Sequence, residues 1–284
     1  MTSTLKKIRE NTRRRLPIAA YLLSGGLVIA LAPTVSGCAS DSGAKQQQTY
    51  ADAAQNLYEG AQKNLEKKNY LDAINQFNTL RNRFPYSKYA PLAELRIGDA
   101  YFAQDSFATA VQQYRGFVQL HPTHPEVPYA EWRVAEAFYK LMPDDWWILP
   151  PAYERNLSKT RDAARELQRF VDRYPNSEYT AGAKKRLARS RRMLADYEMY
   201  VAKFYLDRDN PRAASMRLRY LLEHYSGLGL DPQALFLLAR AYIELGEMPR
   251  ATTALNDLIT YHPTSDYADR ARAYLERYGL KTPG

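Results

Sequence analysis

The stretch YLDAINQFNTLRNRFP at residues 70–85 decides the fold, because its pattern recurs along the chain. The small residue Ala73 is followed by Phe77 and Leu80, four and seven positions later. This spacing places all three residues on one side of an α-helix. Proline lacks the backbone N–H that a helix needs, so Pro85 ends it. The stretch therefore predicts an amphipathic helix that stops near residue 84.

The same pattern occurs five times in all. Its small residues are Ala73, Ala110, Ala163, Ala214 and Ala251, with steps of 37, 53, 51 and 37 residues. Upstream of each copy lies a second helical pattern that combines a small residue with large apolar ones: Leu57/Gly60, Gly98/Tyr101, Ala135/Phe138, Ala202/Tyr205 and Ala239/Tyr242. A repeated helix pair is typical of a solenoid, in which each unit packs only against its neighbours.

These residues resemble the tetratricopeptide repeat, whose small residues let two helices approach while aromatic rings fill the space between them. The resemblance implies an all-α solenoid of about five helix pairs with a C-terminal capping helix. After three of the repeats the chain reads Pro-x-Ser-x-Tyr, which places Ser87, Ser177 and Ser265 to N-cap the next helix.

Two departures from a regular period are informative. Residues 143–158 form an insertion inside the third repeat, and it contains Trp146-Trp147. These tryptophans either fold back onto the solenoid or contact a partner. The second departure is a stretch from Glu178 to Asp207 without proline, which predicts one long helix. Its basic residues form either a solvated face or a docking surface for an acidic partner: Lys184, Lys185, Arg186, Arg189, Arg191 and Arg192.

The N-terminus has the features of an export signal. Six basic groups within residues 1–15 precede an apolar run from Leu16 to Ala32. The tetrapeptide that ends at Cys38 resembles a bacterial lipobox, which implies cleavage and a covalent lipid on Cys38. Ala39 after the cysteine implies the outer membrane, by analogy with known sorting rules, and general secretion is favoured over the twin-arginine route. The alternatives are a plain signal peptide with an incidental cysteine and an uncleaved membrane anchor.

These features divide the chain into four segments. Residues 1–37 are the signal peptide and 38–49 a lipidated flexible tether. Residues 50–176 hold the first three repeats, and 177–284 hold the last two with the capping helix. Removing residues 1–37 lowers the formal net charge from +9 to +4, because six basic groups and one acidic group leave with them. The basic character of the whole chain is thus no argument for a nucleic-acid partner.

No catalytic motif emerges from the sequence. The four histidines lie mostly at repeat ends, and neither His-Glu-x-x-His nor Gly-x-Ser-x-Gly is present. A single cysteine excludes an internal disulfide and a cysteine cluster for zinc. We therefore expect no enzymatic activity, no metal and no cofactor apart from the lipid on Cys38.

Two segments carry a more specific resemblance. They are Pro122-Thr123-His124-Pro125 and Tyr174-Pro175-Asn176-Ser177-x-Tyr179. Together with the lipobox and repeats, they resemble the BamD family of the β-barrel assembly machinery, over residues 50–280. The resemblance implies a periplasmic scaffold at the outer membrane. Its partners would be the periplasmic domains of BamA, other assembly-machinery lipoproteins and unfolded outer-membrane proteins.

The resemblance also implies two binding surfaces. Arg217, with Arg208 and Arg212 nearby, would pair with carboxylates of BamA; solvated arginines are the alternative. Substrate would bind the N-terminal repeats. Aligning the repeats places seven residues on the groove face of their first helices: Tyr58, Gln62, Asp99, Phe102, Trp132, Glu136 and Tyr139. Some of these aromatic residues would instead belong to the core between repeats.

Two rival functions share the lipid anchor and the repeats. The first is a different periplasmic repeat lipoprotein of a Tol or cell-division complex. The second is a cell-wall factor that positions a hydrolase. Partners that co-purify with the protein distinguish the three.

Overall fold

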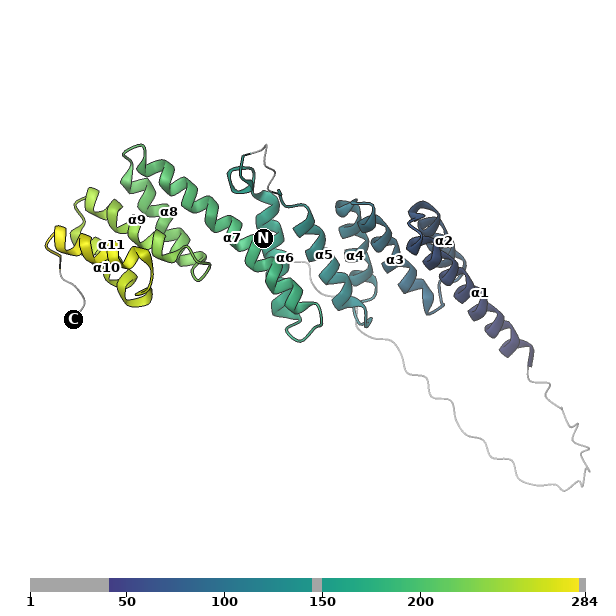
Figure 1. Cartoon of the computed structure of the whole chain (residues 1–284). Coiled ribbons are helices and arrows are strands. Elements are labelled where there is room, and N and C mark those ends of the chain that lie inside the picture. Colours follow the sequence, from purple (N-terminus) through teal and green to yellow (C-terminus); the bar gives the residue numbers. More distant parts are fainter. Residues whose placement is uncertain (1–40, 145–149, 281–284) are drawn as a thin grey trace, which may run out of the picture. The chain divides into compact units, whose positions relative to one another are not determined.

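The computed structural model describes residues 41–144 and 150–280. The predictions for Cys38 and for Trp146-Trp147 lie outside these residues. Within them the structure holds eleven α-helices, one short 3-10 helix and no strand (Figure 1). The helices are α1 (Asp41–Glu66), α2 (Tyr70–Arg83), α3 (Tyr89–Ala103), α4 (Phe107–Leu120), α5 (Val127–Lys140), η1 (Ala152–Glu154), α6 (Ser158–Arg173), α7 (Thr180–Leu206), α8 (Pro211–His224), α9 (Asp231–Glu244), α10 (Met248–Tyr261) and α11 (Asp266–Arg277). The predicted all-α class is confirmed.

The helices form five consecutive pairs, α1/α2 to α9/α10, and α11 packs on the last pair. Helices α2 to α11 each pack mainly on their neighbours in the chain. The predicted solenoid of five helix pairs with a C-terminal capping helix is therefore confirmed. No helix in the described part of the chain is both long and apolar enough to cross a membrane.

Four of the five pairs close with the same turn. Two or three positions after the end of the first helix, one residue has a positive φ of 54° to 71°: Lys68, Asp105, Asp209 and Gly246. The next backbone N–H then donates to a carbonyl five residues back, with N–O distances of 2.8 to 3.0 Å. This is the geometry of a Schellman C-cap, which ends the first helix and starts the second within a few residues. The third pair lacks the turn because the insertion lies there.

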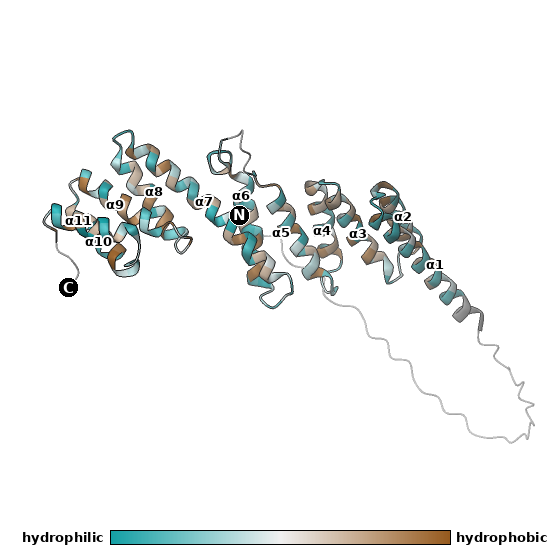
Figure 2. Cartoon of the chain, viewed as in Figure 1, coloured by the Kyte–Doolittle hydropathy of each residue, from teal (hydrophilic) through white to brown (hydrophobic). Residues whose placement is uncertain are grey.

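The small residues of the repeat lie at helix contacts. The five motif alanines have no exposed surface. Gly98 of α3 faces the ring of Tyr114 on α4, and a Cβ atom on Gly98 would lie 2.7 Å from that ring. Figure 2 shows hydrophobic and hydrophilic residues interleaved along the helices, as amphipathic packing requires. The small residues thus let the large rings of the neighbouring helix fit.

The chain is helical earlier than predicted. Helix α1 begins at Asp41, so residues 41–49 are helical, whereas we expected a flexible tether there. Residues 46–49 are nevertheless exposed. Tyr50 makes an edge contact with Phe84 at 4.9 Å between ring centroids. Tyr50 therefore packs on the residue that follows α2, and the backbone before it is helical where we expected a flexible tether.

The predicted serine caps are confirmed at one position of three. Ser265 accepts a hydrogen bond from the backbone N–H of Tyr267 and caps α11. Ser177 accepts from Tyr179 N–H at 3.3 Å, but Tyr179 is the N-cap residue of α7. The Ser87 hydroxyl has no hydrogen-bond partner in the described structure. At Ser87 and Ser177 a tight turn separates the serine from the helix, so the cap prediction was wrong there.

Part of the insertion packs on the solenoid. Ala152 of η1 and Leu157 are buried against Met142, Met193 and other core residues. The predicted long helix is confirmed as α7, Thr180–Leu206.

Candidate protein-binding surfaces

A ladder of alternating charges joins the first helices of repeats two, three and four. We call it the charge ladder: Arg96 and Asp99 on α3, Arg133 and Glu136 on α5, and Arg186 on α7. Its ion pairs span 2.6 Å from Arg96 to Asp99, 3.7 Å from Arg133 to Asp99, 2.7 Å from Arg133 to Glu136 and 2.8 Å from Arg186 to Glu136. The i,i+3 spacing within α3 and within α5 puts each pair on one helix face. The ladder therefore ties three successive repeats together.

Asp99 is the most connected carboxylate of the ladder. One of its oxygens accepts hydrogen bonds from the hydroxyls of Tyr114 at 2.7 Å and Tyr129 at 2.8 Å. Arg96 donates to the other oxygen. Burial and, next, the negative charge of Asp99 raise the pKa of both tyrosine hydroxyls. The tyrosines thus stay protonated and act as hydrogen-bond donors.

Aromatic rings flank the guanidinium groups of the ladder. The guanidinium carbon of Arg133 lies 3.6 Å from the centroid of the Phe102 ring. Arg186 lies 4.9 Å from the ring of Trp132 and 5.7 Å from that of Tyr139. Such cation–π contacts hold a guanidinium flat against a ring while its edge can still donate hydrogen bonds. The result is a surface of rings and arginines along α3, α5 and α7.

Most of the groove residues predicted from the sequence lie in or beside this surface. Tyr58 joins it through a 3.4 Å hydrogen bond from Arg96. Gln62 does not, because its amide donates to Glu66 on its own helix. Trp132 is only 7% exposed and packs in the core between repeats, as the alternative interpretation expected. The carboxylates of Asp99 and Glu136 accept hydrogen bonds from residues of the next repeat, Tyr129 and Arg186, and so link neighbouring repeats.

Sequence reasoning missed several members of the ladder. Arg96, Arg133, Tyr114 and Tyr129 were not among the predicted groove residues, and Arg186 was named only among the basic residues of the long helix. A signal for two of them was present: Arg-x-x-Asp at 96–99 and Arg-x-x-Glu at 133–136 are 37 residues apart, which is the step of the first repeat.

Arg217, predicted to contact a partner, lies on α8 and is partly bonded within the repeat. Its Nη1 atom donates to Glu198 of α7 at 3.2 Å. The Arg217 side chain is 42% exposed and that of Glu198 only 8%. Arg217 thus neutralises a buried carboxylate and still presents part of its guanidinium to solvent. The other two predicted arginines, Arg208 and Arg212, are exposed.

Exposed apolar side chains accompany these arginines. Tyr200 and Phe204 of α7 and Met216 and Tyr220 of α8 are 39% to 66% exposed. The guanidinium of Arg208 lies 4.2 Å from the Phe204 ring. With the three arginines, these four side chains form what we call the repeat-four surface. Tyrosine, phenylalanine, methionine and arginine are the residue types enriched at protein interfaces.

The two most specific sequence segments meet in space. Pro125, the last residue of the first segment, and residues 174–179 line a common cavity of about 530 Å³, together with Glu126, Pro128, Tyr129 and Arg173. His124 shapes the first turn, because its Nδ1 atom accepts the backbone N–H of Glu126 at 3.1 Å. This contact agrees with the turn role expected for the histidines. Among the described residues, no group of three or more His, Cys, Asp or Glu could hold a metal ion.

The chain is similar to known proteins over most of its length. The family model described as "YfiO: Outer membrane lipoprotein" matches residues 50–254. Outer membrane protein assembly factor BamD of Neisseria meningitidis serogroup A is 29% identical over 255 residues, which cover 86% of this chain and 93% of that protein. BamD of Xylella fastidiosa strain 9a5c is 30% identical over 244 residues, which cover 84% of this chain and 81% of that protein. Among solved structures, the TPR2AB domain of yeast Sti1 is 13% identical and covers 80% of this chain and 86% of its own, with a TM-score of 0.40.

Proposed function

Because the chain belongs to the YfiO family of outer membrane lipoproteins, we propose that it is a non-enzymatic scaffold for the assembly of outer-membrane proteins. In this role it binds BamA and unfolded outer-membrane proteins. The relatives it matches are named outer membrane protein assembly factors. The observation that carries the proposal is that α7, α8 and the turn between them expose rings and arginines, with Arg208 and Phe204 in direct contact.

The repeat-four surface suits an acidic, partly apolar face of BamA. Arg208, Arg212 and Arg217 offer guanidinium forks that bind carboxylates in a bidentate manner, which lysine cannot reproduce. The rings beside them offer apolar contact area. Both kinds of group are exposed in the chain alone, so a partner can bury them.

The substrate surface in this proposal is the face of rings and arginines along α3, α5 and α7. An extended segment of an unfolded barrel protein exposes backbone carbonyls and aromatic side chains. Guanidinium edges donate to the carbonyls, and half-buried rings such as Phe102 and Tyr139 pack on the side chains. The lipid on Cys38 would hold the scaffold at the periplasmic face of the outer membrane, where such segments arrive.

One purification tests both the scaffold and the anchor. A C-terminally tagged protein is purified from detergent-solubilised outer membranes, and mass spectrometry identifies stoichiometric partners and the mature N-terminal peptide. We expect BamA and a triacylated peptide that begins at Cys38. Recovery of a Tol component or a cell-wall hydrolase without BamA contradicts the proposed function and leaves the fold intact. An unmodified Cys38 contradicts the anchor alone.

A further inference from the structure

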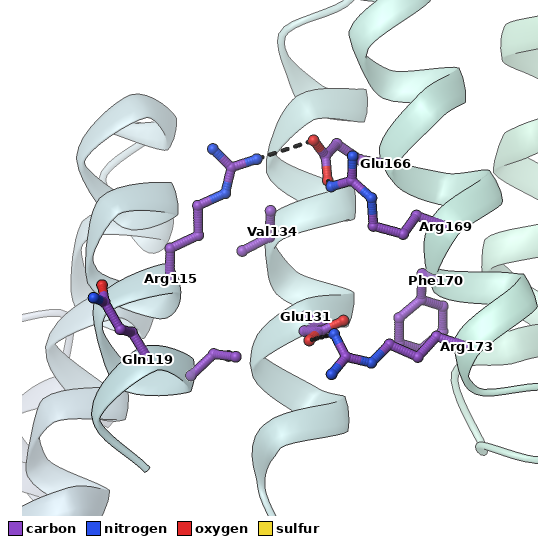
Figure 3. Close-up of a pocket in the computed structure, with 9 residues that line it drawn as sticks. Arg115, Gln119, Glu131, Val134, Glu166, Arg169, Phe170 and Arg173 are labelled. Atoms are coloured by element: carbon purple, nitrogen blue, oxygen red, sulfur yellow. Dashed lines mark hydrogen bonds and ion pairs between the residues drawn. The ribbon is translucent and has the colours of Figure 1, made fainter. Parts of the chain in front are cut away.

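A cleft between α4 and α6, with α5 as its floor, lies apart from both surfaces described above (Figure 3). We call it the charged cleft. Its charged and aromatic lining consists of Arg115, Glu131, Glu166, Arg169, Phe170 and Arg173. Its volume is about 220 Å³. Small-molecule sites typically span roughly 300–1,000 Å³, so this cleft has room for one or two side chains of a peptide.

Three arginines and two glutamates meet at the charged cleft. Glu166 pairs with Arg115 at 2.9 Å and with Arg169 at 2.6 Å. Glu131 pairs with Arg173 at 2.6 Å. Both carboxylates are at most 15% exposed, whereas the three arginines are 52% to 59% exposed. The negative groups therefore lie deep and the positive groups lie at the opening.

The arginines retain hydrogen-bonding capacity. A guanidinium has five N–H donors. In the described structure each of the three uses one nitrogen to bond a cleft glutamate. Beside them, Val118, Val134 and Phe170 supply an apolar wall, and Figure 3 shows Val134 between the flanking arginines. The cleft thus offers free N–H groups next to apolar surface.

A second cleft lies at the equivalent positions of a later repeat, and it lacks the two glutamates of the charged cleft. It lies between α8 and α10 over α9 and has a volume of about 470 Å³. Counted from the motif alanines, Arg219 occupies the position of Arg115. Leu235 and Ala254, however, stand where the charged cleft has Glu131 and Glu166. The repeat architecture therefore forms a cleft at both places, whereas the buried carboxylates occur only in the cleft formed with α5 and α6.

We propose that the charged cleft binds an acidic peptide segment of a protein partner. One carboxylate of the peptide accepts from Arg115 and a neighbouring arginine, and an adjacent aliphatic side chain packs on Val118 and Val134. Three guanidiniums and two carboxylates give the cleft one net positive charge. That charge matches one carboxylate better than a doubly charged phosphate.

Peptide selection with a matched counter-selection tests the proposal. A phage library of random peptides of about twelve residues is depleted on the full-length Arg115→Ala protein and then selected on the wild type. The best peptide is labelled with fluorescein, and its affinity is measured by fluorescence polarisation. We expect the enriched peptides to share an Asp or Glu beside an aliphatic residue. Loss of a charge-assisted hydrogen bond then predicts about tenfold weaker binding to Arg115→Ala.

Two further variants separate binding from structural support. Arg219→Ala removes the register-equivalent arginine of the other cleft and is expected to leave the affinity unchanged. Glu131→Gln raises the net charge of the cleft, so we expect tighter binding, an effect that loss of structure would not produce. The proposal is overturned if no peptide is enriched, if enriched peptides lack acidic residues, or if Arg219→Ala weakens binding as much as Arg115→Ala. Circular dichroism of each variant verifies that it is folded.

Discussion

The carboxylate of Asp99 on α3 lies 2.7 Å from the hydroxyl of Tyr114 on α4, a ring with no exposed surface. Tyr129 of α5 donates to the same oxygen at 2.8 Å. One acidic side chain thus joins three helices of two repeats. Since each repeat of a solenoid contacts only its neighbours, such a tie affects the cooperativity of the whole array.

Replacing Asp99 by alanine is expected to destabilise the protein strongly. The change leaves the hydroxyls of the buried Tyr114 and the partly buried Tyr129 without their acceptor, and Arg96 without its carboxylate partner. Removing one member of a buried charged pair costs about 3–5 kcal/mol. Urea unfolding followed by circular dichroism measures the effect. Asp172→Ala, on the exposed side of α6, is the control and should change stability by less than about 1 kcal/mol. Equal losses in the two variants would contradict the role of Asp99.

Two glycine substitutions should have opposite signs. At Gly98 a Cβ atom would lie 2.7 Å from the Tyr114 ring, so Gly98→Ala forces packed helices apart. Overpacking of this kind costs about 1–3 kcal/mol. At Gly116 of α4, no atom beyond the local helix backbone and the two adjacent residues lies within 4 Å of the added Cβ. Gly116→Ala should therefore raise stability by about 0.5–1 kcal/mol, because alanine favours the helix. A stabilising Gly98→Ala in the same unfolding assay would refute the close contact.

The helices were predictable because their signals are local. Ala73, Phe77 and Leu80 lie within one helix, and their spacing alone identifies a buried stripe. The same holds for the long helix α7. The spacing of residues within one helix cannot identify partners on other helices. Tyr114 and Tyr129, for example, donate to Asp99 from 15 and 30 positions away in the sequence.

The predicted groove residues show the same limit of sequence reasoning. Aligning the repeats identified positions on the first helices, but it could not show which polar groups there bond to one another. Gln62 occupies a position equivalent to those of the other groove residues, yet its amide donates a hydrogen bond to Glu66 on the same helix. The charged cleft depends on Arg115 and Glu166, which are 51 positions apart. Only the packing of α4 against α5 and of α5 against α6 brings them together.

Alkaline pH should destabilise the protein. Burial, and then the neighbouring Tyr220, raises the pKa of Tyr225 to about 12. Tyrosine in an unfolded chain has a pKa of about 10. The folded state holds the proton more tightly, so the stabilisation is complete below about pH 10 and is lost as the pH rises through about 12. Urea midpoints at about pH 9 and pH 11 measure the loss. Tyr225→Phe should reduce the difference between them, and an unchanged difference would assign the effect to other groups.

Arg217 requires a test that separates docking from stability. Arg217→Glu should weaken the recovery of BamA, but it also places a second carboxylate beside the buried Glu198. The double variant Glu198→Gln/Arg217→Gln removes both charges and leaves no buried ion unpaired. If the guanidinium binds BamA, the double variant is folded and still recovers less BamA in a pull-down. Arg208→Glu is a second test of BamA binding, since Arg208 is exposed and contacts the Phe204 ring. Full recovery of BamA by all three variants would refute the docking surface.

The surface of rings and arginines along α3, α5 and α7 predicts where an unfolded substrate attaches. A synthetic peptide that ends in an aromatic barrel signal and carries a photoreactive group should label α3, α5 or α7. Tyr139→Leu removes a half-buried ring that faces Arg186, and we expect the labelling yield to fall about two- to tenfold, the range of one aromatic contact. Tyr86→Leu is the matched control, because Tyr86 is 95% exposed and lies outside this surface. Labelling confined to residues beyond α7, or an equal loss in both variants, would show that substrate binds elsewhere on the scaffold.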